Sequence, residues 1–296
     1  MTLDILLPYY GDPNLMRAAV RSVRAQENPD WILTVVDDAY PDPTVKKWFE
    51  EIRDPRLRYS RNESNLGANG NYRRCLSLVT QDWFTIMGAD DIMAPDYVDV
   101  IISAAAAAPH AGIVQPGVNI IDEHGNPATP LADRMKAWYA PRGSGRLVLD
   151  GELLATSLMR ANWTYFPSLA WRTAALPEHG FRAGFDVVQD LALIMDVITR
   201  DWAMVLDDRS CFDYRRHLGS DSAVKAMNGT RFDEERRYFL MIAGEMDARG
   251  WSRAARTARR HISSRLNAAT LLPTAIRAGR AADLRNLSRH VLTRFA

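Results

Sequence analysis

Short apolar runs alternate with segments of helical spacing along the first 120 residues of the chain. The apolar runs have the length of buried strands and occupy residues 3–8, 31–36, 57–60, 83–87 and 112–118. The segments between them have the apolar spacing of helices and occupy residues 14–26, 45–52, 69–78 and 97–108. This order predicts an α/β fold with a mostly parallel sheet flanked by helices, in which ligand groups lie at the carboxyl ends of the strands.

The rest of the chain is less regular at first and then becomes helical. Between residues 121 and 225 we expect helices at 150–159 and 188–198, and short strands at 169–171, 203–206 and 211–214. Beyond residue 230 the pattern predicts helices at 232–249, at 252–269 and after residue 281. We therefore expect a body of residues 1–225, with halves at 1–118 and 119–225, and a C-terminal helical extension of residues 226–296.

The composition is that of a folded globular protein. Hydrophobic residues make up 47% of the 296 residues and charged residues 25%, which excludes a predominantly disordered chain. Cys75 and Cys211 have neither metal-site spacing nor a redox partner, so we expect a cytoplasmic location. No apolar run reaches the roughly 18–20 residues that span a bilayer. The first residues include Pro8 and lack a cationic stretch, which is not typical of a signal peptide.

The formal net charge of +1 is an average over two unlike parts. Residues 231–296 contain 14 Arg, no Lys and 6 acidic residues, a net charge of +8, which leaves −7 for residues 1–230. A cationic amphipathic helix can lie on an anionic membrane surface, so one hypothesis is peripheral contact of residues 231–296 with the inner face of the plasma membrane. The other is a helical annex with solvated or paired arginines. No nucleic-acid-binding motif accompanies the arginines, so we expect no nucleic-acid partner.

Two acidic pairs stand at predicted strand ends. Asp37 and Asp38 follow one apolar run, and Asp90 and Asp91 follow shortly after another. Adjacent carboxylates repel one another unless a cation or hydrogen-bond donors compensate. Hard divalent ions such as Mg²⁺ and Mn²⁺ prefer oxygen ligands and often share them with a substrate diphosphate. The alternative is that Asp91 caps the next helix or that both pairs face solvent.

An ordered set of segments resembles family 2 glycosyltransferases of the GT-A fold. The segments of the first half are Leu6-Leu7-Pro8-Tyr9-Tyr10, Val35-Val36-Asp37-Asp38, Asn65-Leu66-Gly67 and Met87-Gly88-Ala89-Asp90-Asp91. Those of the second half are Pro167-Ser168-Leu169-Ala170-Trp171-Arg172, His179-Gly180-Phe181, Val188-Gln189-Asp190-Leu191 and Tyr214-Arg215-Arg216-His217-Leu218-Gly219-Ser220. The resemblance covers about residues 3–222 and implies a Rossmann-like GT-A catalytic domain, with a nucleotide-binding half followed by an acceptor-binding half.

The resemblance also implies a reaction. A sugar would move with inversion from a nucleotide-diphosphate sugar, with UDP- or dTDP-sugars favoured, to a hydroxyl of a glycan or lipid-linked acceptor. Asp190 would be the general base that deprotonates this hydroxyl. Bound Mn²⁺ or Mg²⁺ would stabilise the leaving diphosphate. A homo-oligomer is compatible with the sequence.

The matched positions imply roles for individual residues. Tyr10 would stack on the base of the donor, and Asp38, together with Asp37, would hydrogen-bond it. Asp91 would be the principal metal ligand, Asp90 would reach the ribose or the metal, and His217 would bind the metal or the diphosphate. Further donor-binding candidates are Pro8, Asn65, Gly67, Asn71 and Arg215.

Three positions depart from the pattern. Gly88 replaces the first acid of the usual Asp-x-Asp, Gln189 replaces a common Glu, and Gly11 replaces an Asn. Two alternatives therefore stay open. One is a nucleotide-sugar-binding or scaffold protein that has lost turnover. The other is a sugar-phosphate nucleotidylyltransferase, although its basic, glycine-rich loop after the first strand is absent.

Overall fold

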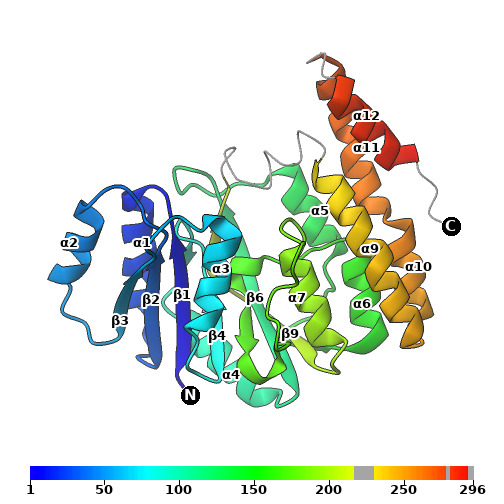
Figure 1. The fold of residues 1–296 in the computed structure, drawn as a ribbon. Coiled ribbons are helices and arrows are strands. Elements are labelled where there is room, and N and C mark those ends of the chain that lie inside the picture. Colours follow the sequence, from blue (N-terminus) through cyan, green and yellow to red (C-terminus); the bar gives the residue numbers. More distant parts are fainter. Residues whose placement is uncertain (217–229, 278–280, 293–296) are drawn as a thin grey trace.

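The first half of the protein is a parallel sheet with helices on both faces (Figure 1). In the computed structural model, which describes residues 1–216, 230–277 and 281–292, the strands β1 (Leu3–Tyr9), β2 (Trp31–Asp37), β3 (Leu57–Arg61) and β4 (Trp83–Ile86) pair in parallel in the order β3-β2-β1-β4. The intervening helices are α1 (Pro13–Arg24), α2 (Thr44–Glu51) and α3 (Gly67–Ser77), and α4 (Tyr97–Ala107) follows β4. The register pairs Tyr9 with Asp37, so β1 and β2 end side by side.

The second half extends this sheet with mixed pairing. The strand β8 (Ala170–Arg172) is antiparallel to both β4 and β6 (Ala111–Ile121), and β6 is parallel to β9 (Ala203–Arg215). Two short strands, β5 (Ile92–Met93) and β7 (Arg146–Leu149), are antiparallel to β9. The helices of this half are α5 (Leu131–Tyr139), α6 (Gly151–Arg160) and α7 (Gln189–Ile198), and single 3-10 turns cover Phe166–Ser168 and Thr173–Ala175.

The sheet separates two apolar cores. Side chains alternate across β1, so Ile5 and Leu7 join the core beneath α1 and α4, whereas Leu6 joins the core beneath α3, α6 and α7. Burial on both faces explains why the strands read as continuous apolar runs in the sequence.

The C-terminal helices pack against the second core. They are α9 (Thr230–Ala248), α10 (Ser252–Arg260), α11 (Ile262–Arg277) and α12 (Ala281–Leu292). Tyr238 and Ile242 of α9 and Ala254 of α10 belong to the same apolar cluster as α6 and α7. The helices α11 and α12 extend beyond the body (Figure 1), and a smaller cluster that includes Phe232 and Leu287 joins them to α9. None of the helices in the described ranges is long and apolar enough to cross a membrane.

Most predicted elements are present within one or two residues of their expected ends. One predicted helix is in fact two helices, two predicted strands are one strand, and one helix was not predicted. Residues 252–269 form two helices, because His261 adopts a left-handed backbone with φ of 44° and stacks on Phe239 at 3.5 Å between ring centroids. The strands expected at 203–206 and 211–214 are one strand, β9, whose exposed middle is polar and hid its continuity. The helix α5 lies where the pattern was irregular.

The buried His261 leads to a prediction about acid stability. Burial is the main reason that the pKa of His261 is lowered to about 3; Glu235 opposes the shift, and His290, Arg231 and Arg265 add to it. The unfolded chain takes up a proton near its ordinary pKa of about 6.5, which the folded side chain does not. The contribution of His261 to stability is therefore complete above that pH and is lost as the pH falls toward 3.

We expect His261→Gln, which cannot titrate, to lose less stability than the wild type between about pH 7 and about pH 5. Urea unfolding followed by circular dichroism at both pH values measures this. His110→Gln changes an exposed histidine and serves as the control. An identical pH dependence for wild type and His261→Gln would contradict the account.

Candidate active site

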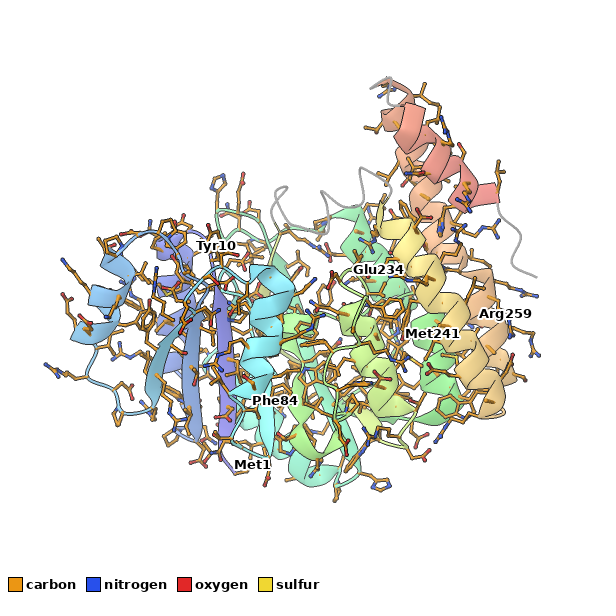
Figure 2. The ribbon with its side chains drawn as sticks, viewed as in Figure 1. Met1, Tyr10, Phe84, Glu234, Met241 and Arg259 are labelled. Atoms are coloured by element: carbon orange, nitrogen blue, oxygen red, sulfur yellow. The ribbon has the colours of Figure 1, made fainter. Side chains whose placement is uncertain are left out.

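Two tyrosine rings stand at the ends of β1 and β2. Tyr10, which is labelled in Figure 2, is 57% exposed. Its ring meets the ring of Tyr40 edge-on, with 5.4 Å between centroids. Ala39 adopts a left-handed backbone with φ of 59°, and the amide of Tyr40 donates to Asp37 Oδ1 at 2.7 Å. This turn brings Tyr40 back toward β1. Sequence reasoning singled out Tyr10 and missed Tyr40, whose only signal was its place after the acidic pair.

The two acids that follow β2 have different surroundings. Asp37 is fully buried and accepts hydrogen bonds from the amide of Tyr40, the hydroxyl of Tyr59 and Arg61 Nη1, the last at 2.7 Å. Asp38 accepts bonds at Oδ1 only, from Asn62 Nδ2 and the amide of Leu66, both at 2.8 Å, and no described residue donates to its Oδ2. Asp38 therefore keeps an acceptor for a ligand, whereas Asp37 holds the strand end together.

Polar residues after β3 form a hydrogen-bond network that includes Asp38. Asn71 is buried, donates from Nδ2 to the carbonyl of Val36 at 2.9 Å and accepts from Asn62 at 3.0 Å. Asn65 Oδ1 accepts from the amide of Gly67 at 2.8 Å, and Gly67 starts α3 with a left-handed φ of 73°. These bonds fix the loop that carries Asn62 and Leu66. Pro8 lies within β1, half-buried and opposite Val36 in register.

Asp90 and Asp91 follow β4 in a tight turn. Asp91 is almost wholly buried, and its Oδ1 accepts from the backbone amide of Arg215 at 2.9 Å. Burial, and then the charge of Asp90, raises the pKa of Asp91 well above its usual range. A Cβ atom on Gly88 would lie 2.5 Å from Asp91 Oδ2 and 3.0 Å from Asp90 Oδ1. The glycine at the position where the family has an acid therefore lets both carboxylates fold back over the turn.

Arg215 fixes this turn from β9. Its side chain is buried, Nε donates to the carbonyl of Asp90 at 2.7 Å, and Nη1 donates to the carbonyls of Asp122 at 3.0 Å and Glu123 at 3.3 Å. The guanidinium thus joins the Asp90–Asp91 turn to the hairpin after β6. The next residue, Arg216, is also bound within the protein, because it forms two hydrogen bonds with Asp133 of α5, at 2.8 and 3.1 Å.

The donor set at this turn suits a hard divalent cation. Asp90 and Asp91 offer carboxylate oxygens, and a cation would compensate the like charges of this partly buried pair. Within residues 1–216, 230–277 and 281–292, no three His, Cys, Asp or Glu side chains come together in a group that could hold a metal ion. His217, the third expected ligand, lies outside the described residues.

Asp190 lies in the first turn of α7 and lines a cavity of about 250 Å³. Asn162 Nδ2 donates to its Oδ2 at 3.2 Å, and the amide of Leu191 donates to its Oδ1 at 2.7 Å. Its place in the first turn puts the carboxyl group at the positive end of the helix dipole. The cavity is also lined by Asn69, Tyr72, Phe166, Gln189 and Tyr214.

Two tyrosines connect this cavity with the acidic turn. Tyr72 is half-buried, and burial, followed by the charges of Tyr214, Asp91 and Asp90, raises its pKa. Burial raises the pKa of Tyr214 to about 12, and Asp91 and Asp90 contribute. Both rings therefore lie within electrostatic reach of the acidic turn and in the wall of the cavity that holds Asp190.

Gln189, which stands where the family commonly has Glu, bridges α7 and α3. Its Nε2 donates to Asn69 Oδ1 at 2.7 Å, and its buried Oε1 has no hydrogen-bond partner among the described residues. The neutral side chain therefore binds across the cavity without placing a second charge beside Asp190.

Aromatic residues of the second half divide into exposed and buried groups. Trp138 is exposed and meets Tyr139 edge-on, with 4.7 Å between centroids. Trp163 is buried and its Nε1 donates to Ser157 Oγ at 3.1 Å, so it belongs to the core. Tyr165 contacts Lys136, whose Nζ lies 4.3 Å from the ring centroid and donates to the carbonyl of Thr164 at 2.6 Å.

The fold defines a class of protein. The chain superimposes on the S. aureus TarS fragment 1–349 in complex with UDP-GlcNAc with a TM-score of 0.59, over 98% of this chain and 90% of that chain. The same TarS fragment in complex with UDP gives a TM-score of 0.56. The sequence identities are 13% and 14%, so this likeness is one of fold, and the fold is the α/β GT-A fold expected from the sequence.

The family follows from the sequence itself. The family profile described as "Glycosyl transferase family 2" matches residues 4–160, more than half of the chain. This protein belongs to glycosyltransferase family 2.

Curated relatives, two of them named as glycosyltransferases, match part of this chain and part of their own length. The chain is 22% identical over 125 residues to the putative glycosyltransferase EpsE of Bacillus subtilis, which is 42% of this chain and 45% of EpsE. It is 28% identical over 106 residues to the abequosyltransferase RfbV of Salmonella typhimurium, which is 34% of this chain and 32% of RfbV. An uncharacterised Sinorhizobium fredii protein, y4gI, is 25% identical over 203 residues, 67% of this chain and 20% of y4gI. The matches thus span less than half the length of these relatives.

The two acids after β2 lead to a prediction about stability. We expect Asp37→Asn to lower the free energy of unfolding by about 1–3 kcal/mol, because Asp37 is buried and both of its oxygens accept hydrogen bonds. Asp38→Asn retains an oxygen that can accept from Asn62 and Leu66, so its cost should be smaller. Urea unfolding of the two variants measures both effects, and equal losses would contradict the different roles given to these acids.

Proposed function

We propose that the protein is an inverting glycosyltransferase that moves a sugar from a nucleotide-diphosphate sugar to a hydroxyl group of a glycan or lipid-linked acceptor. The observation that supports this most is the wall shared by two parts of the site. Tyr72 and Tyr214 line the cavity that contains Asp190, and the charges of Asp90 and Asp91 raise the pKa of both tyrosines. A donor diphosphate at the turn would thus have its sugar directed toward the cavity.

The nucleotide of the donor would lie at the ends of β1 and β2. Tyr10 would stack on the base, with Tyr40 supporting its ring, and Asp38 Oδ2 would accept from the imino group of a uracil or thymine. Asn71 would act by fixing the loop that carries Asn62, and Asp37 by fixing the end of β2. Pro8, Asn65 and Gly67 would shape the wall around the nucleoside. The TarS structures with UDP and UDP-GlcNAc support a UDP-sugar, and a dTDP-sugar has the same recognition pattern on its base.

The diphosphate would lie beside the acidic turn. Asp91 and Asp90, with His217, would hold Mn²⁺ or Mg²⁺, and Arg215 would keep the turn in place through its bonds to Asp90 and Asp91. When bound, the ion would supply Lewis-acid stabilisation of the negative charge on the leaving nucleoside diphosphate.

The chemical step would be a single displacement. Asp190 takes the proton of the acceptor hydroxyl, the hydroxyl oxygen forms a bond to the anomeric carbon, and the bond from that carbon to the diphosphate oxygen breaks. The attack comes from the face opposite the leaving group, so the anomeric configuration inverts. A positioned base contributes roughly 10²–10⁴-fold to such a rate. Membership of family 2 speaks against the nucleotidylyltransferase alternative, and a protein without turnover is an outcome of the test below.

Nucleotide release from a panel of UDP-, GDP- and dTDP-sugars with Mn²⁺ tests this function, with pooled p-nitrophenyl glycosides as acceptors. We expect turnover with at least one donor and a loss of about 10²-fold or more in Asp190→Asn, because the base is removed. Asp91→Ala should also lose activity, whereas Asp99→Asn on the exposed side of α4 serves as the control. Nucleotide binding without turnover would favour the scaffold alternative, and full activity of Asp190→Asn would refute the assignment of the base.

We also propose that α10 and α11 place the enzyme on the anionic inner face of the plasma membrane. The exposed side chains of Arg253, Arg256 and Arg260 lie three and four residues apart, on one face of α10, and form no ion pair with any described residue. Ile262 and Leu266 follow on α11 with more than half of each side chain exposed. Exposed cations beside exposed aliphatic side chains fit an anionic lipid surface, which would suit a lipid-linked acceptor.

Co-sedimentation with vesicles of phosphatidylglycerol and phosphatidylcholine tests this surface. Each arginine near such a surface contributes about 1 kcal/mol, so replacing all three α10 arginines by Gln should weaken binding about a hundredfold. Replacing Arg21, Arg53 and Arg58, which are exposed on the body, by Gln is the matched control. Equal binding by both variants would contradict the proposal. Absence of vesicle binding together with a dimer in solution would instead assign the apolar face to a homo-oligomer.

A further inference from the structure

The helix α9 of the C-terminal extension holds the loop that leads into Asp190. Glu234 Oε1 accepts from the backbone amides of Val187 at 2.5 Å and Val188 at 3.1 Å. Val188 is the N-cap residue of α7, and its own side chain forms no capping hydrogen bond. The first amides of a helix lack partners within it, and an acceptor side chain normally supplies one. Here a carboxylate from a separate helix binds the two amides that directly precede Gln189 and Asp190.

Further charged contacts bind the same loop to α9. Arg237 donates to the carbonyl of Gly184, and its guanidinium lies 5.0 Å from the centroid of the Phe185 ring. Arg182 bridges α7 and α9, because it bonds Asp196 at 3.0 Å and Glu245 at 2.7 Å. Residues 182–188 are therefore bonded to α9 at both ends and in the middle.

A cation of α9, Arg231, also interacts electrostatically with Asp190. Arg231 is half-buried, and burial lowers its pKa, but the carboxylates of Glu235 and Asp190 outweigh this effect and raise it. On another side, burial and the charge of Arg216 lower the pKa of Lys136 to about 8, while Asp190 and Asp133 oppose them. The charge of Asp190 thus acts on a cation of α5 and on a cation of α9.

We propose that α9 is part of the catalytic apparatus and that Glu234 is a positioning residue for Asp190. This inference rests on the proposed function, in which Asp190 is the base. Glu234 sets the backbone from which Asp190 projects into the cavity, and Figure 2 shows Glu234 near the N-terminal end of α9. Without it, two amides lose their acceptor and the start of α7 is free to shift. A displacement of about 1 Å of a reacting group can reduce a rate by about 10²-fold.

Three variants test this role. Glu234→Ala removes the acceptor, Glu234→Gln keeps an amide oxygen that can accept from both amides, and Asp233→Ala changes the exposed neighbour as a control. With the donor and acceptors of the nucleotide-release assay, Glu234→Ala should lower kcat about ten- to a hundredfold with an unchanged KM for the donor. Glu234→Gln should recover most of this loss. Glu234→Ala should cost nothing further in an Asp190→Asn background, because both changes act on the same group.

Hydrogen exchange keeps the test independent of activity. Exchange in a peptide covering residues 182–190 should be faster in Glu234→Ala than in the wild type, and unchanged in Glu234→Gln and Asp233→Ala. Unchanged exchange in Glu234→Ala, a normal kcat, or an additive loss with Asp190→Asn would each overturn the positioning role. A wild type without turnover, or an active Asp190→Asn, would instead refute the proposed function, and the exchange data would still show whether Glu234 holds the loop.

Discussion

The buried carboxylate of Asp91 is the constraint on which the site depends. It stands at the end of the parallel half of the sheet, and its main protein partner is the backbone amide of Arg215 at the end of β9. Burial makes an uncompensated charge costly, so this position requires bonds from both halves of the molecule. The side chain of Arg215 adds a bond to Asp90, and the absence of a side chain on Gly88 leaves room for the turn.

The sequence predicted the strands and acids of the first half well, because short buried strands and their polar ends are local signals. Asp38 and Asp190 could be singled out from such signals together with a family resemblance. The different surroundings of Asp37 could not, since Tyr59 and Arg61 reach it from the neighbouring strand β3. Local patterns also missed α5 as an element, and with it the contacts of Asp133 and Lys136 near Asp190.

The structure explains part of the difference in net charge between residues 1–230 and residues 231–296. In the body, acids gather at the strand ends, where a cation and a nucleotide are proposed to bind. In the extension, Arg231, Arg249 and Arg259 pair with acidic residues, and so belong to the packing of α9 and α10. The exposed arginines of α10 are the part of the positive charge that a membrane surface would use. Because α9 also bonds the loop before Asp190, the extension would serve the proposed site as well as the proposed membrane surface.

A crystal structure with Mn²⁺ and the nucleotide sugar that is turned over tests the central claim most directly. The account predicts the base against Tyr10 with its imino group on Asp38, the diphosphate and metal at Asp90 and Asp91, and the anomeric carbon facing the cavity that holds Asp190. A donor bound elsewhere, or one whose anomeric carbon faces away from Asp190, would contradict it.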